Sequence, residues 1–135
     1  MRCHTGPHTV RQVSPDPRQT LGRQGEQHAL DHLRRLGYDL VAANHRTRFG
    51  EIDLVMRDAE ALVFVEVKSR RAQRPAAVWD ALDDRKRRQV RRMARAYLYE
   101  QDDRPTAATI RFDAVGVVMD ARGALVRLDH LEAAF

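Results

Sequence analysis

The sequence contains a single cysteine, Cys3, and no apolar run that approaches the length of a membrane span. A lone cysteine excludes a framework of internal disulfides and a zinc site built from thiolates. A spanning helix needs about 20 consecutive apolar residues, and the polar, proline-containing start lacks the apolar segment of a secretory signal peptide. We therefore expect a cytoplasmic protein that makes no contact with a membrane.

Lysine is also scarce, because only Lys68 and Lys86 among the 24 basic residues are lysine. The net charge is +5 and the sequence pI is near 10.1. Between Lys68 and Arg95, eleven basic residues accompany only three acidic ones. Such a local excess favours a polyanionic partner over a merely soluble basic surface. We expect that partner to be nucleic acid, with DNA ahead of RNA.

The length and composition suit one compact α/β domain, since 43% of the 135 residues are hydrophobic and 32% are charged. Residues 1–18 are rich in proline and poor in apolar side chains, so we expect a disordered basic tail followed by a single domain over residues 19–135. The apolar periodicity predicts the order α-β-β-β-α-β-β, with helices over 22–36 and 84–99 and strands over 38–47, 52–57, 61–68, 109–119 and 124–128.

The predicted hairpin GEIDLVMRDAEALVFVEVKSR, residues 50–70, carries charges where a buried strand should be apolar. If Ala59 and Glu60 form the turn, Asp53 lies across from Glu66, and Glu51 lies beyond it toward Lys68. Crowded carboxylates repel one another, and a bound Mg²⁺ or Mn²⁺ relieves this repulsion. The turn lacks an Asn-Gly signature, so a slip of the register remains an alternative.

Two further acidic residues lie on predicted buried faces. The apolar face of the first helix, formed by Ala29, Leu30, Leu33 and Leu36, extends one turn back to Glu26. A carboxylate in a first turn commonly balances the helix dipole, but this one faces the sheet, and we favour a functional role. Asp113 is expected to form a structural salt bridge with Arg111. On the opposite side of the helix, His28 and His32 are expected to be solvated rather than metal-bound.

Basic residues surround the hairpin in the sequence. In the second helix, Val90, Met93, Ala94, Tyr97 and Leu98 form the predicted buried stripe, and arginines occupy most of the remaining surface. Lys86 and Gln89 lie near that stripe and are predicted to face the same cleft as Glu66, with Glu51 as another helper. The arginines of this helix form either a solvated face or a set of phosphate ligands. Arg46 and Arg48, near the carboxylates of the hairpin, either form ion pairs with them or receive phosphate. The predicted nucleic-acid contacts are Arg46, Arg48, Arg70, Arg71, Arg87, Arg88, Arg91 and Arg92.

An Asp followed thirteen residues later by Glu-x-Lys is the spacing of the PD-(D/E)xK nucleases. Asp53 and Glu66 would hold the metal ion, whose charge offsets that on the scissile phosphate. Lys68 would position the attacking water or stabilise the transition state as a compact point charge. Glu26 would complete the coordination or orient that water. We therefore predict a catalytic set of Glu26, Asp53, Glu66 and Lys68, with Glu26, Asp53 and Glu66 as metal ligands.

The series GRQGEQHALDHLRRLGYDLVAANHRTRFGEIDLV, then LVFVEVKSR, RFDAV and HLEAAF, resembles the YraN family of small bacterial proteins over residues 22–135. The resemblance implies a restriction-endonuclease-like fold related to Holliday-junction resolvases, with a central mixed sheet of about four to five strands flanked by helices. It also implies the same four nuclease residues. The expected function is a metal-dependent DNA endonuclease acting on structured or branched DNA. The alternatives are a non-catalytic nucleic-acid-binding module and an interaction protein working as a homodimer.

Overall fold

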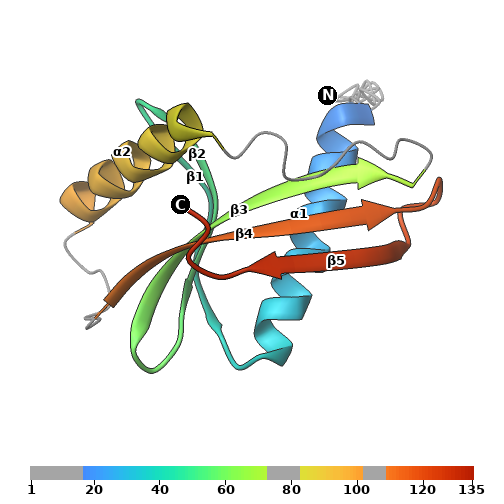
Figure 1. The fold of residues 1–135 in the computed structure, drawn as a ribbon, viewed down its shortest axis with the longest axis horizontal. Helices are drawn as coiled ribbons and strands as arrows, with labels where there is room; N and C mark the ends of the chain where they lie inside the picture. The colour runs from blue at the N-terminus through green and yellow to red at the C-terminus, as the bar shows by residue number, and fades with distance from the viewer. Residues whose placement is uncertain (1–16, 73–82, 102–108) are drawn as a thin grey trace, which may run out of the picture.

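The computed structural model describes residues 17–72, 83–101 and 109–135 of the chain. The predicted α/β class and the order α-β-β-β-α-β-β are both confirmed (Figure 1). Most of the predicted tail, residues 1–16, lies outside the described residues. The elements are α1 (Pro17–Arg35), β1 (Asp39–Thr47), β2 (Gly50–Arg57), β3 (Ala61–Arg71), α2 (Asp84–Glu100), β4 (Thr109–Met119) and β5 (Leu125–Leu131).

The strands form one mixed sheet in the order β1-β2-β3-β4-β5, in which only β3 and β4 are parallel. The β2–β3 hairpin has the predicted register, because Leu54 pairs with Val65 and Arg57 pairs with Leu62. The carboxylate of Asp58 fixes the turn by accepting hydrogen bonds from two backbone N–H groups, those of Glu60 at 2.8 Å and Ala61 at 2.6 Å. An Asp side chain therefore stabilises this turn, which lacks the Asn-Gly pair that is common in hairpins.

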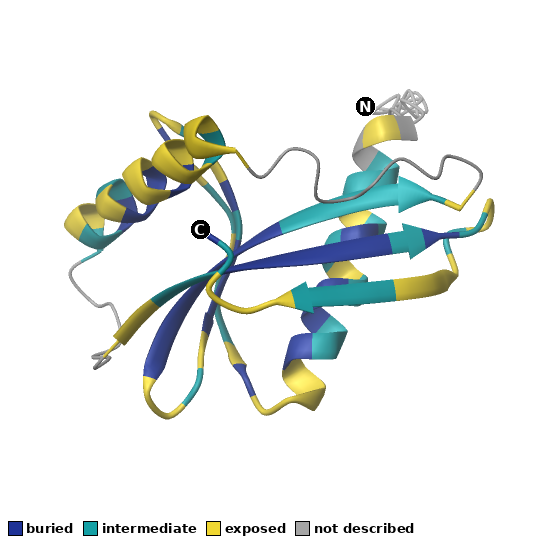
Figure 2. Ribbon diagram, in the orientation of Figure 1, coloured by how far each residue is buried: buried dark blue, intermediate teal, exposed yellow. Residues whose placement is uncertain are grey.

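The two helices cover opposite faces of the sheet. α1 packs Leu33 against a cluster that includes Met56 and Val115, and α2 packs Met93 and Tyr97 against a second cluster on the other face. β3 lies between the two clusters and is buried from Ala61 to Glu66, as its continuous apolar run predicted. Figure 2 shows this buried centre and the exposed outer side of α2.

Some predicted boundaries and faces were wrong. α1 begins at Pro17, five residues before the predicted start and just inside the segment assigned to the tail. The helix ends at Arg35, and Gly37 follows with a positive φ of 95°, so Leu36 is past the helical face and is 56% exposed. β5 continues to Leu131, three residues beyond the prediction. Among the described residues, no helix is both long and apolar enough to cross a membrane.

The predicted solvated histidine face of α1 was also wrong. His28 Nε2 lies 2.9 Å from the carbonyl oxygen of Gly123, and His32 Nε2 lies 3.3 Å from Nδ1 of His130 on β5. The sheet extends beyond β3 to β4 and β5, so this side of α1 meets the sheet rather than water. The helical period shows which residues share a face, but it does not show how wide the opposing sheet is.

Candidate metal and phosphate site

The candidate site lies where β2 separates from β3. Backbone pairing between these strands runs from Arg57 and Leu62 as far as Leu54 and Val65. One residue further, the carboxylate of Asp53 accepts a hydrogen bond from the backbone N–H of Val67 at 2.8 Å. Beyond this point β1 and β2 turn toward α2, while β3 continues beside β4 (Figure 1). The separation leaves acidic side chains at a gap in the hydrogen-bonding ladder.

Three carboxylates converge at this gap from two elements. Glu26 reaches it from α1, and Glu51 and Asp53 reach it from the start of β2, so that one oxygen of each lies within 4.8 Å of the others. Glu26 and Asp53 are half-buried and Glu51 is exposed. Oxygen ligands of one Mg²⁺ ion lie up to about 4 Å apart, since each metal–oxygen bond is about 2.1 Å. A small adjustment of side chains would let the three bind one hard cation.

The surroundings of Asp53 oppose its negative charge. Burial and the nearby charge of Glu66 raise the pKa of Asp53 to about 7, against the lowering effect of the Val67 N–H group. The pKa of Glu26 is also raised, first by burial and then by the charge of Glu51, while a hydrogen bond from the Asn44 side chain works in the opposite direction. A divalent cation would reverse this penalty by pairing with both carboxylates in their ionised form.

Glu66 forms ion pairs with two lysines and is not one of the three converging carboxylates. It is 8% exposed, and its Oε1 lies 2.7 Å from Nζ of Lys86 on α2 and 3.7 Å from Nζ of Lys68. The structure therefore brings the predicted residues Glu26, Asp53, Glu66 and Lys68 to one place. It puts Glu51 in the group of converging oxygens, and it engages Glu66 in two ion pairs.

Asn44 is a member of the site that the sequence did not reveal. In the register of β1 and β2 it lies opposite Asp53, between the pairs Ala43–Leu54 and His45–Ile52. It has a positive φ of 51°, a left-handed conformation that asparagine tolerates better than most residues. Its side chain hydrogen-bonds Glu26. The only sequence signal for this role of Asn44 was its position opposite Asp53 in the paired strands.

The predicted cleft helpers make different contacts. Lys86 faces the site through its ion pair with Glu66. Gln89 instead donates from Nε2 to the carbonyl oxygen of Phe49, at 3.3 Å. Gly50 packs against the same part of α2 with a φ of +138°, and a Cβ there would lie 2.9 Å from Sδ of Met93. These contacts fasten the turn between β1 and β2 to α2.

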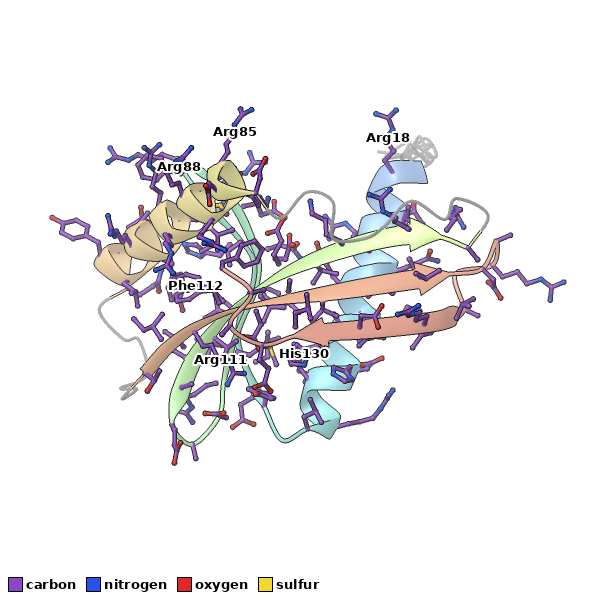
Figure 3. All side chains as sticks on the ribbon, viewed as in Figure 1. Arg18, Arg85, Arg88, Arg111, Phe112 and His130 are labelled. Atoms are coloured by element: carbon purple, nitrogen blue, oxygen red, sulfur yellow. The ribbon has the colours of Figure 1, made fainter. Side chains whose placement is uncertain are left out.

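Four of the predicted nucleic-acid ligands lie near this turn or on the outer side of α2. Arg46 and Arg48 are exposed at the end of β1. Arg88 and Arg92 are exposed on α2, and with Phe49, Arg85 and Gln89 they line an open depression of about 470 Å³. In Figure 3, Arg85 and Arg88 project from α2 away from the sheet. Neither Phe49 nor Arg85 was among the predicted contacts.

Three of the four remaining predicted ligands have partners within the protein. Arg71 donates to the carbonyl oxygens of Asp120 and Ala121, and it sits where β3 ends. Arg91 donates to the carbonyl oxygen of Phe135 at 3.1 Å and lies over the ring of Phe112. Arg87 lies 3.9 Å from Asp84, one turn earlier in the helix. Arg70 is half-buried on β3.

Comparison with known proteins identifies relatives along most of the chain. The model of the uncharacterised protein family UPF0102 matches residues 25–117, which include all four residues of the predicted catalytic set. A UPF0102 protein of Pelotomaculum thermopropionicum is 38% identical over 120 residues, covering 89% of this chain and 98% of its own. A UPF0102 protein of Nocardia farcinica is 43% identical over 118 residues, covering 87% and 91%. One of Mycolicibacterium gilvum is 41% identical over 119 residues, covering 87% and 94%.

Proposed function

The chain belongs to the uncharacterised protein family UPF0102, the YraN family, and we propose that it is a metal-dependent endonuclease that hydrolyses phosphodiester bonds of DNA. The observation that carries the proposal is the convergence of Glu26, Glu51 and Asp53 within 4.8 Å, beside the ion-paired Glu66 and Lys68. Structured or branched DNA is the substrate class that the family resemblance favours.

The donor set fits Mg²⁺ or Mn²⁺ by its chemistry. All three converging ligands are carboxylates, and hard oxygen donors suit these ions better than they suit softer metals. Asp53 is destabilised as an anion by burial and by Glu66, which is the electrostatic condition that a bound cation removes. When bound there, the ion would acidify a water molecule and offset charge on the scissile phosphate.

The protein groups have separable roles in this proposal. Glu26, Glu51 and Asp53 would bind the cation, with Asp53 held in place by the N–H group of Val67. Nζ of Lys86 lies 2.7 Å from Oε1 of Glu66 and orients this carboxylate. Glu66 would then either join the coordination or orient the attacking water. Lys68 has a side chain that is 32% exposed, and it is placed to stabilise negative charge on the phosphate during attack. The arginines on the outer side of α2 supply phosphate contacts.

The test is cleavage of labelled DNA in the presence of Mn²⁺ or Mg²⁺. Four-way-junction, single-stranded and plain duplex substrates should be compared for wild type, Glu66→Gln and Lys68→Met. We expect each variant to lose at least about 100-fold in rate, since each loses a charge that acts in the transition state.

Glu60→Gln is the matched control, because Glu60 lies exposed in the turn at the far end of the same hairpin. It should cleave like wild type. Cleavage by Glu66→Gln and Lys68→Met at the wild-type rate would overturn the assignment of the site. Absence of cleavage by the wild-type protein on every substrate would overturn the endonuclease proposal itself.

A non-catalytic DNA-binding module is the second candidate, and the Lys86–Glu66 ion pair favours it. At 2.7 Å the ammonium group neutralises a carboxylate that a nuclease would use for its metal. This candidate predicts DNA affinity that does not change when Mn²⁺ is replaced by EDTA, and no Mn²⁺ binding by calorimetry. The endonuclease predicts Mn²⁺ binding that Asp53→Asn abolishes.

A further inference from the structure

The depression beside α2 is the strongest unassigned feature among the described residues. Phe49 forms one wall, and Arg85, Arg88, Gln89 and Arg92 form the rest. Phe49 is an aromatic residue in an exposed turn, with 37% of its surface accessible. A lone exposed phenylalanine needs no explanation, but one that shares a depression with three arginines combines an apolar plane with a concentration of positive charge.

The position of Phe49 is fixed by its neighbours rather than left to a free loop. Its backbone N–H donates to Oγ1 of Thr47 at 3.1 Å, and its carbonyl oxygen accepts from Gln89 at 3.3 Å. The guanidinium of Arg48 lies over its ring, 4.8 Å from the centroid. Because two hydrogen bonds fix the backbone of Phe49, less conformational entropy is lost when a ligand stacks on its ring.

We propose that this depression is a nucleotide subsite, in which an unpaired base stacks against Phe49 and its phosphate is bound by Arg88 and Arg92. Every base has a π-face, and stacking on an aromatic side chain is the common way in which proteins hold single-stranded nucleotides. Arginine gives the planar, bidentate geometry that phosphate oxygens require. The volume of about 470 Å³ falls within the usual range for small-ligand sites.

The subsite adjoins the candidate metal site on two elements. Phe49 is two residues before Glu51, so the chain separates them by at most about 7 Å, and Arg85 is next to Lys86, which contacts Glu66. A nucleotide held at Phe49 would therefore lie beside the scissile phosphate. The inference rests on the proposed nuclease function for this last step, and it specifies the substrate: DNA with an unpaired nucleotide next to the cut.

The test measures binding in EDTA, so that it does not depend on cleavage. Fluorescence anisotropy would compare labelled single-stranded DNA, duplex with a one-nucleotide bulge, and plain duplex of the same sequence. We expect Phe49→Leu to weaken binding to the first two by about tenfold, in line with the loss of one stacked base. Binding to the plain duplex should change by less than about twofold.

The chain offers a matched control in Tyr99, an aromatic residue at the other end of α2 that is 90% exposed. Tyr99→Leu should leave all three affinities unchanged, and Phe49→Trp should retain the preference for unpaired DNA. Arg88→Ala should weaken binding to all three and reduce the slope of log K against log salt by about 0.7 on the single strand and 0.9 on the duplex.

The outcomes separate this inference from the nuclease proposal. If Phe49→Leu weakens the three substrates equally, or weakens none, the stacking subsite is wrong even when the wild-type protein cleaves DNA. If the preference for unpaired DNA depends on Phe49 but no substrate is cleaved with Mn²⁺, the subsite stands and the endonuclease proposal fails.

Discussion

At the scale of single residues, Asp53 is the most informative side chain in the site. Its pKa is raised from 3.8 to about 7 by burial and by Glu66, even though the Val67 N–H group stabilises the anion. Between these two values the folded chain holds a proton that the unfolded chain has released. The contribution of Asp53 to the stability of the metal-free protein should therefore fall as the pH rises from about 4 to 7, and the full penalty should be present above pH 7.

Asp53→Asn tests this charge penalty. Asparagine has no charge, and its carbonyl oxygen can still accept from the Val67 N–H group. In EDTA at pH 8 we expect the variant to be more stable than wild type by about 1–3 kcal/mol, with the difference vanishing near pH 3.5. Urea unfolding at several pH values measures it. A variant less stable than wild type at pH 8 would show that the Asp53 anion is favoured in the fold.

With metal present, we expect the wild-type protein to gain stability that Asp53→Asn does not gain. Mn²⁺ should raise the melting temperature of the wild-type protein at pH 8, because it binds the folded carboxylates and not the dispersed ones of the unfolded chain. Asp53→Asn should show little or no such rise. An equal rise in both proteins would place the metal elsewhere.

At the scale of elements, the distance between α1 and β3 determines whether Glu26 reaches the site. Gly25 is buried against Ser69 on β3, and a Cβ at this position would overlap the Ser69 side chain. Glu26 is the next residue, so the close approach that glycine permits also brings its carboxylate to Glu51 and Asp53. The same helix contains Gly22, where an added Cβ would meet nothing within 4 Å.

The pair Gly25→Ala and Gly22→Ala separates packing from helix propensity. We expect Gly25→Ala to destabilise the fold by about 1–3 kcal/mol, the usual cost of overpacking, and to weaken Mn²⁺ binding by displacing Glu26. Gly22→Ala should be neutral or should stabilise by up to about 1 kcal/mol, because alanine is the better helix former. Thermal unfolding and calorimetry measure both. Equal effects on stability would mean that the Ser69 side chain moves aside without strain when the methyl group is added.

At the scale of the whole molecule, a buried polar network joins α1, the β1 entry, β4 and β5. Burial alone would raise the pKa of Asp113, but hydrogen bonds from His130 and Arg111 and from the Ala133 N–H group hold it below its ordinary value. Arg111 also donates to the Tyr38 hydroxyl group at 2.6 Å. Because the pKa of Asp113 is lowered, its contribution to stability is present at neutral pH and is lost as the pH falls through the folded value.

A second Arg-x-Asp pair in the same chain provides the control for this network. Arg111 and Asp113 form a pair in which the carboxylate is fully buried, whereas Asp129 pairs with Arg127 where both side chains are partly exposed. Asp113→Asn should destabilise the protein at pH 7 by about 3 kcal/mol, because it leaves Arg111 with an uncompensated charge. Asp129→Asn should change stability by less than about 1 kcal/mol. Chemical denaturation of both variants checks the difference, and similar losses would contradict the role of burial.

The sequence by itself determined the element order, the register of the central hairpin and the shared face of Asp53, Glu66 and Lys68 on that hairpin. These follow from local periodicities of two and 3.6 residues and from the position of one turn, all of which are properties of neighbouring residues. The predicted stripe of α2 was correct for the same reason, since Val90, Met93, Ala94 and Tyr97 are its buried residues.

Periodicity predicted that Glu26 and Lys86 face the hairpin, but only the tertiary structure decided which groups they contact there. Glu51 joins the carboxylates because β2 separates from β3 there, and Lys86 reaches Glu66 because α2 crosses that end of the sheet. Phe49 meets three arginines because Gly50 lets the turn approach α2. His32 faces β5 because the sheet is five strands wide. Such contacts depend on crossing angles and strand separation, which no local pattern in the sequence encodes.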